Sequence, residues 1–314
     1  MSKKLLSILL VVGLVLAFVT PVVAAPKPVL YWISHGSPAD PVWIYYLAGA
    51  NQWSKDTGIE VRTSFHSGDV PSQQEAIRSA IAAKAKAIVT TTPDPGSLNK
   101  VIADAHAVGI PVIIINTDDK ASGRDAYVGN DLVDLGRRWA QYLVDKGYVK
   151  TGSFVWMPVE VPGASYGVLE TKGIDGVFKP LGINYEVSGL NTLDQAEVIS
   201  RMADYLTANR NKITAIITLG DLVTGSIKRV FDQVGVAAGA IPAVGWGNSL
   251  DTANEVLKGY VKAAMWADPQ AMSYLGLSMG LMASSGIKPG FDLTLGSMYE
   301  ANRAQYYATI MGGK

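Results

Sequence analysis

Hydroxyl, amide, carboxylate and tryptophan side chains recur where apolar, β-branched runs of this chain end. The run at residues 29–33 is followed by a turn, and residues 87–91, 112–115, 213–218 and 241–244 end in the same way. Parallel strands of an open α/β sheet present their carboxyl ends at one edge, where ligands bind. Aromatic faces there pack on the C–H faces of a polyhydroxylated molecule, while amides and carboxylates bond its hydroxyls. The candidates are Ser34, Asp40, Trp43, Thr91, Thr92, Asn116, Asp221, Trp246 and Asn248.

Each candidate also has a purely structural alternative. Trp43 would serve equally as a core ring one turn into a helix, and Thr91 and Thr92 as caps of the next helix. Asp221 would serve as an N-cap. For Asn116 a role in binding is the favoured interpretation, because an unpaired amide at the end of a very apolar strand is costly.

The sequence contains no complete motif for catalysis or for metal binding. Residues 163–167 match G-x-S-x-G, but a hydrolase of that class needs its histidine after Ser165, and all three histidines precede it. Residues 245–247 begin a dinucleotide fingerprint, yet Leu250 stands where its third glycine belongs. With no cysteine and three scattered histidines, a transition-metal site is not expected. We therefore expect no catalytic residues, no cofactor and no metal.

Composition narrows the classes of partner. The 314 residues carry 27 basic and 27 acidic side chains, so their formal net charge is zero. This balance gives no electrostatic reason to expect nucleic acid or an anionic membrane surface. The apolar fraction of 48% supplies enough material for one or two substantial cores. We expect a monomer.

Residues 1–25 are typical of a signal peptide. Lys3 and Lys4 form a basic start, residues 5–19 are apolar, and small residues around Ala24 and Ala25 offer a cleavage site. Cleavage after Ala24 is favoured, because Pro26 is an awkward residue just past a cut after Ala25. The alternative is a membrane anchor, for which the run is short. The mature protein is thus expected in the periplasm or outside the cell.

The remaining chain alternates strand and helix patterns twice over. Four strand patterns between residues 29 and 115 alternate with helices, which predicts βαβ units and a parallel sheet. A short strand and turn at 127–131 precede a second series, with helices at 132–146, 163–179, 193–209, 221–234, 253–258 and 270–285 and strands between them. The fold class is α/β, with two doubly wound parallel-sheet domains. The breaks near 127–131, 266–269 and 293–298 predict a three-segment hinge, and Gly129 and Gly296 are candidates for its bending points.

The order and spacing of several segments carry a family resemblance over nearly all of the mature sequence. They are Asp40-Pro41-x-Trp43 opening a helix, residues 87–93 before a helix, residues 109–113, Gly220-Asp221, residues 243–246, and residues 263–269 before a helix. Together they resemble the periplasmic sugar-binding proteins of the ribose-binding type, which serve simple-sugar ABC transporters. The resemblance implies the type I periplasmic binding protein fold, with two domains closing on a monosaccharide, and a membrane permease as partner.

The resemblance also implies domain limits and further site residues. The expected domains are 26–128 plus 269–295 and 129–268 plus 296–314. Asp40 and Trp43 fall where the family has an amide and a stacking aromatic, and Lys172 where an arginine commonly reaches the ligand. Positions near a family glutamine, and the turn after the short strand at 127–129, add the candidates Trp266, Asp268 and Asn130.

Departures from the family pattern leave the ligand open. The aspartate–arginine pair expected after the fourth strand is Asn116-Thr117, and Gly247 replaces the aspartate after Trp246. A neutral sugar or sugar-like solute is expected, with autoinducer-2 and nucleosides as alternatives. An enzyme on the same fold would need a base and a nucleophile in reach, which the sequence does not offer. A regulator of the lactose-repressor type would need a DNA-binding segment at the N-terminus, where this chain has an export signal.

Overall fold

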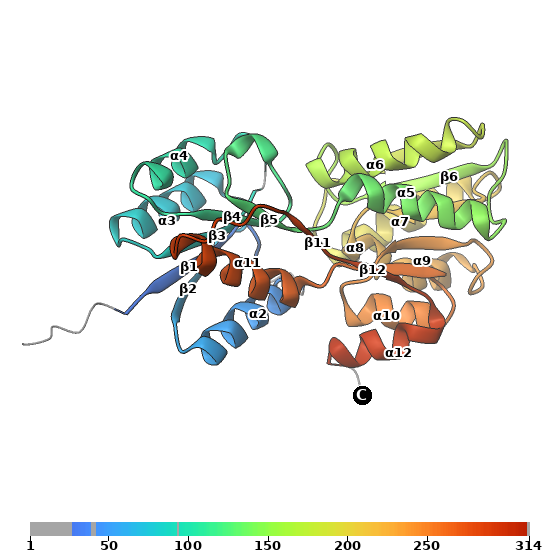
Figure 1. Cartoon of the computed structure of the whole chain (residues 1–314). Coiled ribbons are helices and arrows are strands. Elements are labelled where there is room, and N and C mark those ends of the chain that lie inside the picture. The colour runs from blue at the N-terminus through green and yellow to red at the C-terminus, as the bar shows by residue number, and fades with distance from the viewer. Residues whose placement is uncertain (1–26, 39–41, 93, 313–314) are drawn as a thin grey trace, which may run out of the picture.

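The computed structural model describes residues 27–38, 42–92 and 94–312 as two lobes, each built on one six-stranded sheet (Figure 1). The expected signal peptide and Asp40 lie outside these residues. The strands of the first sheet lie in the order β11-β5-β4-β3-β1-β2, and those of the second in the order β12-β10-β9-β8-β6-β7. All ladders are parallel except that between β10 and β12, which is antiparallel. The predicted α/β class with two parallel-sheet units is confirmed.

The first lobe alternates strands and helices as the apolar runs predict. Its strands are β1 (Val29–Ser34), β2 (Glu60–Phe65), β3 (Ala87–Thr91), β4 (Val112–Asn116), β5 (Ala126–Gly129) and β11 (Leu293–Thr294), and its helices are α2 (Val42–Thr57), α3 (Val70–Ala82), α4 (Asn99–Ala107), α11 (Pro269–Ser284) and the 3-10 turn η1 (Lys120–Ser122). α2 and α11 pack together on one face, where Gly49 lets the helices touch because a Cβ there would lie 2.1 Å from the carbonyl oxygen of Gln270. Ile77 of α3 and Ile102 of α4 belong to the core on the other face.

The second lobe repeats the pattern. Its strands are β6 (Phe154–Val159), β7 (Asn184–Gly189), β8 (Ala215–Thr218), β9 (Ala243–Trp246), β10 (Ala263–Trp266) and β12 (Ser297–Tyr299), and its helices are α5 (Leu132–Asp145), α6 (Ser165–Phe178), α7 (Gln195–Asn209), α8 (Asp221–Thr224), α9 (Ile227–Val234), α10 (Leu250–Leu257) and α12 (Ala301–Ile310). α5 and α6 pack against each other, as do α7 with α9 and α10 with α12. A core in this lobe joins residues of α7, α9, α10 and α12.

Two features of this lobe differ from the sequence predictions. The helix expected over 221–234 is two helices, because the hydroxyl groups of Thr224 and Ser226 bond back to the carbonyls of Gly220 and Leu222 and end the first turn at Gly225. Such hydroxyls compete with continuation of a helix. The C-terminal helix α12 was not predicted, although it buries Ala304, Tyr307 and Ala308.

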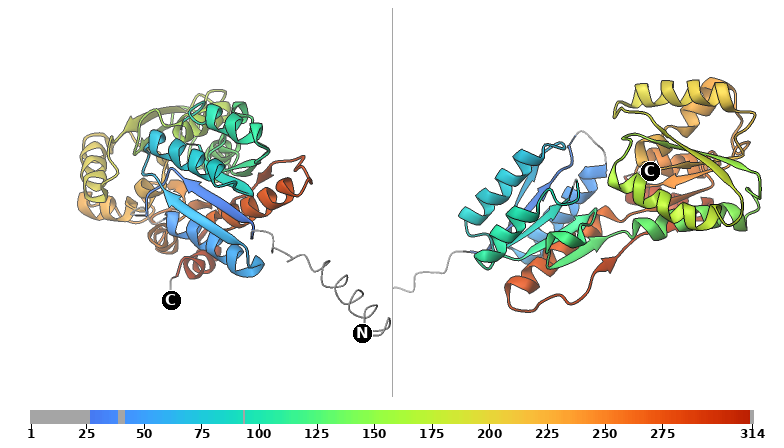
Figure 2. Two further views of the ribbon diagram at one scale, coloured as in Figure 1. Left: turned by 90° about the vertical axis from the view of Figure 1, so that its left-hand side faces the viewer. Right: turned by 90° about the horizontal axis from the view of Figure 1, so that it is seen from above.

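The chain passes between the sheets three times. It leaves the first sheet after β5, returns after β10, and crosses again between β11 and β12, where only Leu295 and Gly296 separate the two strands (Figures 1 and 2). None of the helices in the described part of the chain combines the length and apolar character needed to cross a bilayer.

Candidate functional site

The loop after β1 builds one wall around an indole ring. Ser34 is fully buried, and its hydroxyl oxygen accepts the N–H of Gly36 at 2.9 Å. A Cβ at Gly36 would lie 2.1 Å from the Trp43 ring, so only glycine lets the ring rest against the loop. Trp43 is 6% exposed, and its ring centroid lies 4.7 Å from that of Tyr46 and 5.2 Å from that of His35.

The end of β3 meets the end of β1 at this wall. The Oγ1 of Thr91 accepts the backbone N–H of His35 at 2.9 Å and lies 2.6 Å from its Nδ1. Burial lowers the pKa of His35 to about 4, so its imidazole is neutral at neutral pH. The Oγ1 of Thr92 is buried without a hydrogen-bond partner among the described residues.

The end of β4 adds an amide. Asn116 has a φ of 72°, a left-handed conformation that asparagine tolerates better than most residues. Its Nδ2 donates to the Tyr46 hydroxyl at 2.7 Å, and its carbonyl accepts the Tyr127 hydroxyl at 2.5 Å. Asn116 is therefore held from both sides at the carboxyl edge of the first sheet, together with Ser34, Trp43 and Thr91.

The second lobe contributes a carboxylate and an amide from neighbouring strand ends. Asp221 follows β8, and its Oδ1 accepts the N–H of Asn248 at 2.6 Å. The Oδ1 of Asn248 in turn accepts the N–H of Ala267, which follows β10, at 2.8 Å. The loops after β8, β9 and β10 are thus tied together through two of the predicted site residues.

Tyr45 of α2, in the first lobe, contacts two residues of the second lobe. Its ring centroid lies 6.1 Å from that of Trp266, and its hydroxyl donates to the carbonyl of Met311 at 3.1 Å. Burial and the negative charge of Asp221 raise the pKa of Tyr45. Tyr45 lies in the first turn of α2, the helix that follows the carboxyl end of β1, and Trp266 is the last residue of β10. Their contact therefore means that the carboxyl edges of the two sheets face each other.

Residues 31–288 match the family described as periplasmic binding protein domain. The chain belongs to this family. Members of the family are solute-binding components of transporters. A comparison with curated proteins finds no match.

Solved structures of this fold cover nearly the whole chain. A carbohydrate transporter from Acidothermus cellulolyticus, in complex with myo-inositol, has 20% identity and a TM-score of 0.80, over 91% of this chain and 98% of that one. A solute-binding protein from Burkholderia graminis, with D-arabinose, has 19% identity and a TM-score of 0.81, over 89% and 97%. A periplasmic solute-binding protein from Actinobacillus succinogenes, with D-allose, has 19% identity and a TM-score of 0.79, over 90% and 100%.

In this periplasmic binding protein, Trp246 lies under the helices α5 and α6 and not beside Trp43. Trp246 is 9% exposed, and its ring meets that of Trp139 edge to face at 5.7 Å. Its Nε1 donates to Oε1 of Glu170 at 3.0 Å. Glu170 is fully buried, and burial raises the pKa of its carboxyl well above the ordinary value, although the Trp246 N–H lowers it.

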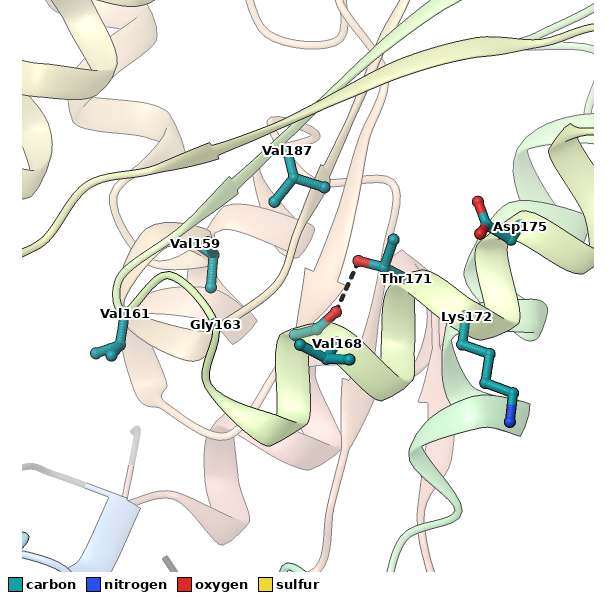
Figure 3. A pocket seen from close by; sticks show the side chains of 9 residues that line it. Val159, Val161, Gly163, Val168, Thr171, Lys172, Asp175 and Val187 are labelled. Carbon is teal, nitrogen blue, oxygen red and sulfur yellow. Dashed lines mark hydrogen bonds between the residues drawn. The ribbon is translucent and has the colours of Figure 1, made fainter. Parts of the chain in front are cut away.

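Lys172 lies on the outside of α6. It lines a hollow of about 420 Å³ beside Val159, Val168 and Val187, and a second hollow of about 740 Å³ between α5 and α6. Figure 3 shows its amino group pointing away from the valines of the first hollow. Lys172 is not brought to the other predicted site residues. Glu170, two positions earlier, points inward instead, because residues two apart on a helix do not share a face.

Asn130 and Asp268 lie at the crossings between the lobes. The Nδ2 of Asn130 donates to the carbonyl of Leu295 at 2.7 Å, so the first and third crossings are joined. Asp268 has a φ of 63° and caps α11 by accepting the N–H of Ala271. Burial raises the pKa of Asp268.

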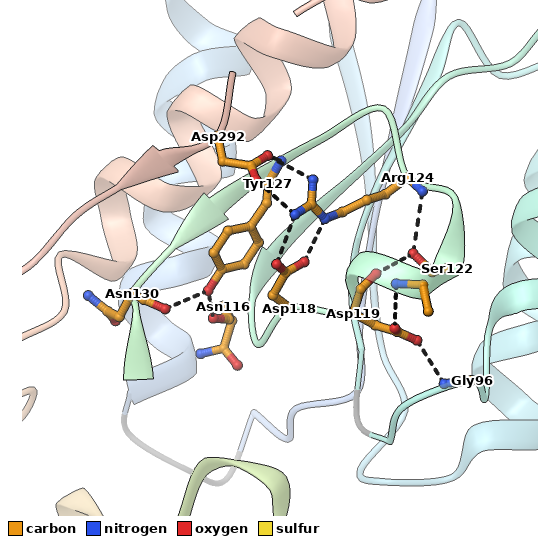
Figure 4. A network of polar contacts seen from close by, with 10 residues as sticks. Gly96, Asn116, Asp118, Asp119, Ser122, Arg124, Tyr127, Asn130 and Asp292 are labelled. Carbon is orange, nitrogen blue, oxygen red and sulfur yellow. Dashed lines mark hydrogen bonds and ion pairs between the residues drawn. The ribbon is translucent and has the colours of Figure 1, made fainter. Parts of the chain in front are cut away.

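An arginine that the sequence did not single out clamps the third crossing. Arg124 donates to both oxygens of Asp118, at 2.5 and 2.8 Å, and to both oxygens of Asp292, at 2.7 and 2.9 Å (Figure 4). Asp292 also accepts the N–H of Tyr127. Asp292 directly precedes β11, the strand that leads into the third crossing. This cluster therefore fixes the start of that crossing to the first lobe.

Three residues near the strand ends were missed by sequence reasoning. His35 directly follows β1, and this position at a strand end was the only indication in the sequence that it could belong to the site. Tyr45 is two residues beyond Trp43 and points to the other lobe. Glu160 directly follows β6, where its carboxylate accepts the N–H of Val223 and burial raises its pKa.

Proposed function

We propose that this chain is an extracytoplasmic solute-binding protein that captures a small neutral sugar or sugar-like molecule between its two lobes and delivers it to the permease of an ABC transporter. The observation that carries the proposal is the pair of facing walls. Hydroxyl, amide, imidazole and aromatic groups at the carboxyl edge of the first sheet stand opposite the Asp221–Asn248 pair, and Tyr45 links the two sides. A few placed polar groups beside aromatic rings are typical of a small-molecule site.

The uncharged side chains of the first wall favour a neutral solute, and the Asp221 carboxylate of the second wall disfavours an anion. The imidazole of His35 is neutral, and Ser34, Thr91 and Asn116 carry no charge. Arg124, which would clamp a carboxylate or phosphate through two parallel bonds, directs its N–H groups to Asp118 and Asp292. Affinity should therefore change little between low and moderate salt.

The domains are proposed to be residues 26–128 plus 269–295 and residues 129–268 plus 296–314. The strands support this division, because β11 pairs with β5 in the first sheet and β12 pairs with β10 in the second. Residues 1–25 are proposed to direct export and to be removed. N-terminal sequencing of the exported protein should begin at Ala25, and an uncleaved N-terminus would contradict this assignment.

The solute-binding function is tested with a defined set of neutral compounds, the neutral-solute panel. It comprises myo-inositol, D-arabinose, D-allose, D-ribose and D-xylose, with autoinducer-2 and adenosine as separate arms. Myo-inositol, arabinose and allose are the compounds bound in the three similar structures. A solute that binds only the folded protein at 100 times its Kd adds about 2.7 kcal/mol to the free energy of unfolding, which raises the melting temperature measurably.

At least one sugar or polyol should raise the melting temperature. A response to autoinducer-2 or adenosine alone would reassign the solute class. Reversible binding without turnover is expected, and recovery of a chemically altered solute after long incubation would favour an enzyme. Size-exclusion chromatography with light scattering should give the mass of one chain.

A further inference from the structure

The imidazole of His35 is fixed at the proposed site by contacts that leave one of its nitrogens unused. His35 is the first residue after β1, and its Nδ1 lies 2.6 Å from the Oγ1 of Thr91, the last residue of the neighbouring β3. Its ring meets that of Trp43 at an interplanar angle of 79°. The ring is therefore held between the end of β3 and the start of α2, at the edge that faces the second lobe.

The contacts of Thr91 select one tautomer of His35. The Oγ1 of Thr91 already accepts the backbone N–H of His35 at 2.9 Å. Its single hydrogen is best used as a donor to Nδ1, since Oγ1 has no other acceptor among the described residues. Nδ1 is then an acceptor, and the hydrogen of the neutral ring resides on Nε2.

The Nε2 nitrogen has no protein acceptor in the described part of the chain. Only Nδ1 of the His35 ring has a protein partner among the described residues, namely Thr91. His66, which follows β2, instead uses both ring nitrogens, one with Ser64 at 2.9 Å and one with Ser72 at 2.8 Å. His35 is only partly buried, and Nε2 is not one of its fully buried atoms, so this nitrogen retains access to solvent. Burial lowers the pKa of His35 to about 4, which keeps the donor uncharged at neutral pH.

We propose that His35 is a solute-binding residue whose Nε2–H donates a hydrogen bond to a hydroxyl or ring oxygen of the bound sugar, with Thr91 as the residue that positions it. This inference rests on the proposed function. An uncharged donor fixed against an aromatic ring suits an oxygen of a neutral polyhydroxylated compound. Thr91 acts through His35, because its hydroxyl sets which nitrogen carries the hydrogen.

Titration of four variants with each sugar and polyol of the neutral-solute panel tests the binding role. His35→Phe keeps a flat ring but removes the donor, and His35→Gln restores an N–H. Loss of one hydrogen bond should weaken binding by about three- to tenfold in His35→Phe, with partial recovery in His35→Gln. Thr91→Val should weaken binding as His35→Phe does. His66→Gln is the matched control and should bind like the wild type.

Nitrogen-15 NMR of the wild-type imidazoles tests the tautomer independently of the variants. The His35 ring should carry its hydrogen on Nε2 between pH 5.5 and 8, and the Nε2 signal should shift when a panel sugar binds. A hydrogen on Nδ1 would overturn the proposal even if His35→Phe fails to fold. So would wild-type affinity in a folded His35→Phe. A wild type that binds no compound of the panel, including autoinducer-2 and adenosine, would overturn the proposed function as well, and so differs from those two results.

Discussion

The rings of Tyr45 and Trp266 lie on opposite lobes, and their centroids are 6.1 Å apart. Tyr45 also donates to the carbonyl of Met311 at the end of α12, so one side chain touches two elements of the other lobe. Each contact is worth about 0.5–1.5 kcal/mol. Tyr45 therefore stabilises this arrangement of the two lobes.

Replacing Tyr45 should open the unliganded protein. Tyr45→Ala removes both contacts, and about 1.4 kcal/mol changes a two-state population tenfold. The radius of gyration from small-angle scattering should rise in Tyr45→Ala and rise less in Tyr45→Phe, which keeps the ring. Ile44→Ala is the control, because Ile44 is 59% exposed and adjacent in sequence. Equal radii in all variants would remove Tyr45 from the closure equilibrium.

Trp43 should contribute to binding beyond its part in the core. Trp43→Leu should weaken binding of the responding panel sugar by about 2 kcal/mol or more, as expected for an aromatic anchor. Trp53→Leu is the matched control, because Trp53 lies on the same helix, is 1% exposed and donates to Ser278. Both variants should lose stability, but only Trp43→Leu should lose affinity. Equal affinities would assign Trp43 to the core alone.

Arg124 should stabilise the first lobe more than an exposed arginine does. Its side chain is 8% exposed, and Arg124→Gln leaves Asp118 and Asp292 without their cation. The loss should be roughly 2 kcal/mol, below the ~3–5 kcal/mol of a fully buried pair, because Asp292 is 38% exposed. Urea unfolding measures it, with Arg137→Gln as the control at a 53% exposed position.

The same variant should change the response to acid. Burial alone would raise the pKa of Asp292, but the hydrogen bonds and charge of Arg124 lower it below its ordinary value. An acid with a lowered folded pKa contributes stability above its unfolded pKa of about 3.9, and this stability is lost as pH falls through the folded value. Arg124→Gln should therefore lose less stability than the wild type on acidification from pH 5. An unchanged acid profile would contradict this linkage.

Glu170 should lower the free energy of unfolding as the pH rises. The raised pKa of its carboxyl means that the folded protein keeps a proton that the unfolded chain releases above about pH 4.3. The cost is absent below that pH and grows by about 1.4 kcal/mol per unit until the folded pKa is reached. Glu170→Gln keeps an acceptor for Trp246 and removes the titration, so it should be more stable than the wild type at pH 8.

Urea unfolding at pH 5 and pH 8 measures the difference. The advantage of Glu170→Gln should be larger at pH 8, whereas Glu75→Gln should be neutral at both values, because Glu75 is 70% exposed on its helix. A Glu170→Gln variant that follows the wild type at both pH values would show that Glu170 is ionised in the folded protein.

The strands and most helices could be predicted from the sequence because β-branched runs and helix periods are local patterns. Residues 112–115 are four apolar residues, and β4 covers them and ends at Asn116. The confirmed parallel architecture follows from the alternation of such runs with helices. α12 was missed because its apolar face, with Ala304 and Tyr307, is small and is specified by packing against α10.

The candidate site was less predictable, because it depends on contacts between distant residues. Asn130 reads as a polar turn residue in sequence, but its amide bonds a carbonyl 165 positions later. Lys172 and Glu170 are both long polar residues on one helix, and only the packing of α6 decides which points inward. Tyr45 could not be assigned to the other lobe from the sequence, because its partners Trp266 and Met311 lie more than 200 residues away.

Closure around a bound solute is measured most directly by small-angle scattering of the wild type with and without a panel sugar, at a concentration where calorimetry shows saturation. Both walls contact the solute in this account, so the closed form binds it more tightly and its population should rise. The radius of gyration should fall on saturation, and it should fall further in Tyr45→Ala, which starts more open. A radius that is unchanged at saturation in both proteins would contradict capture between the lobes.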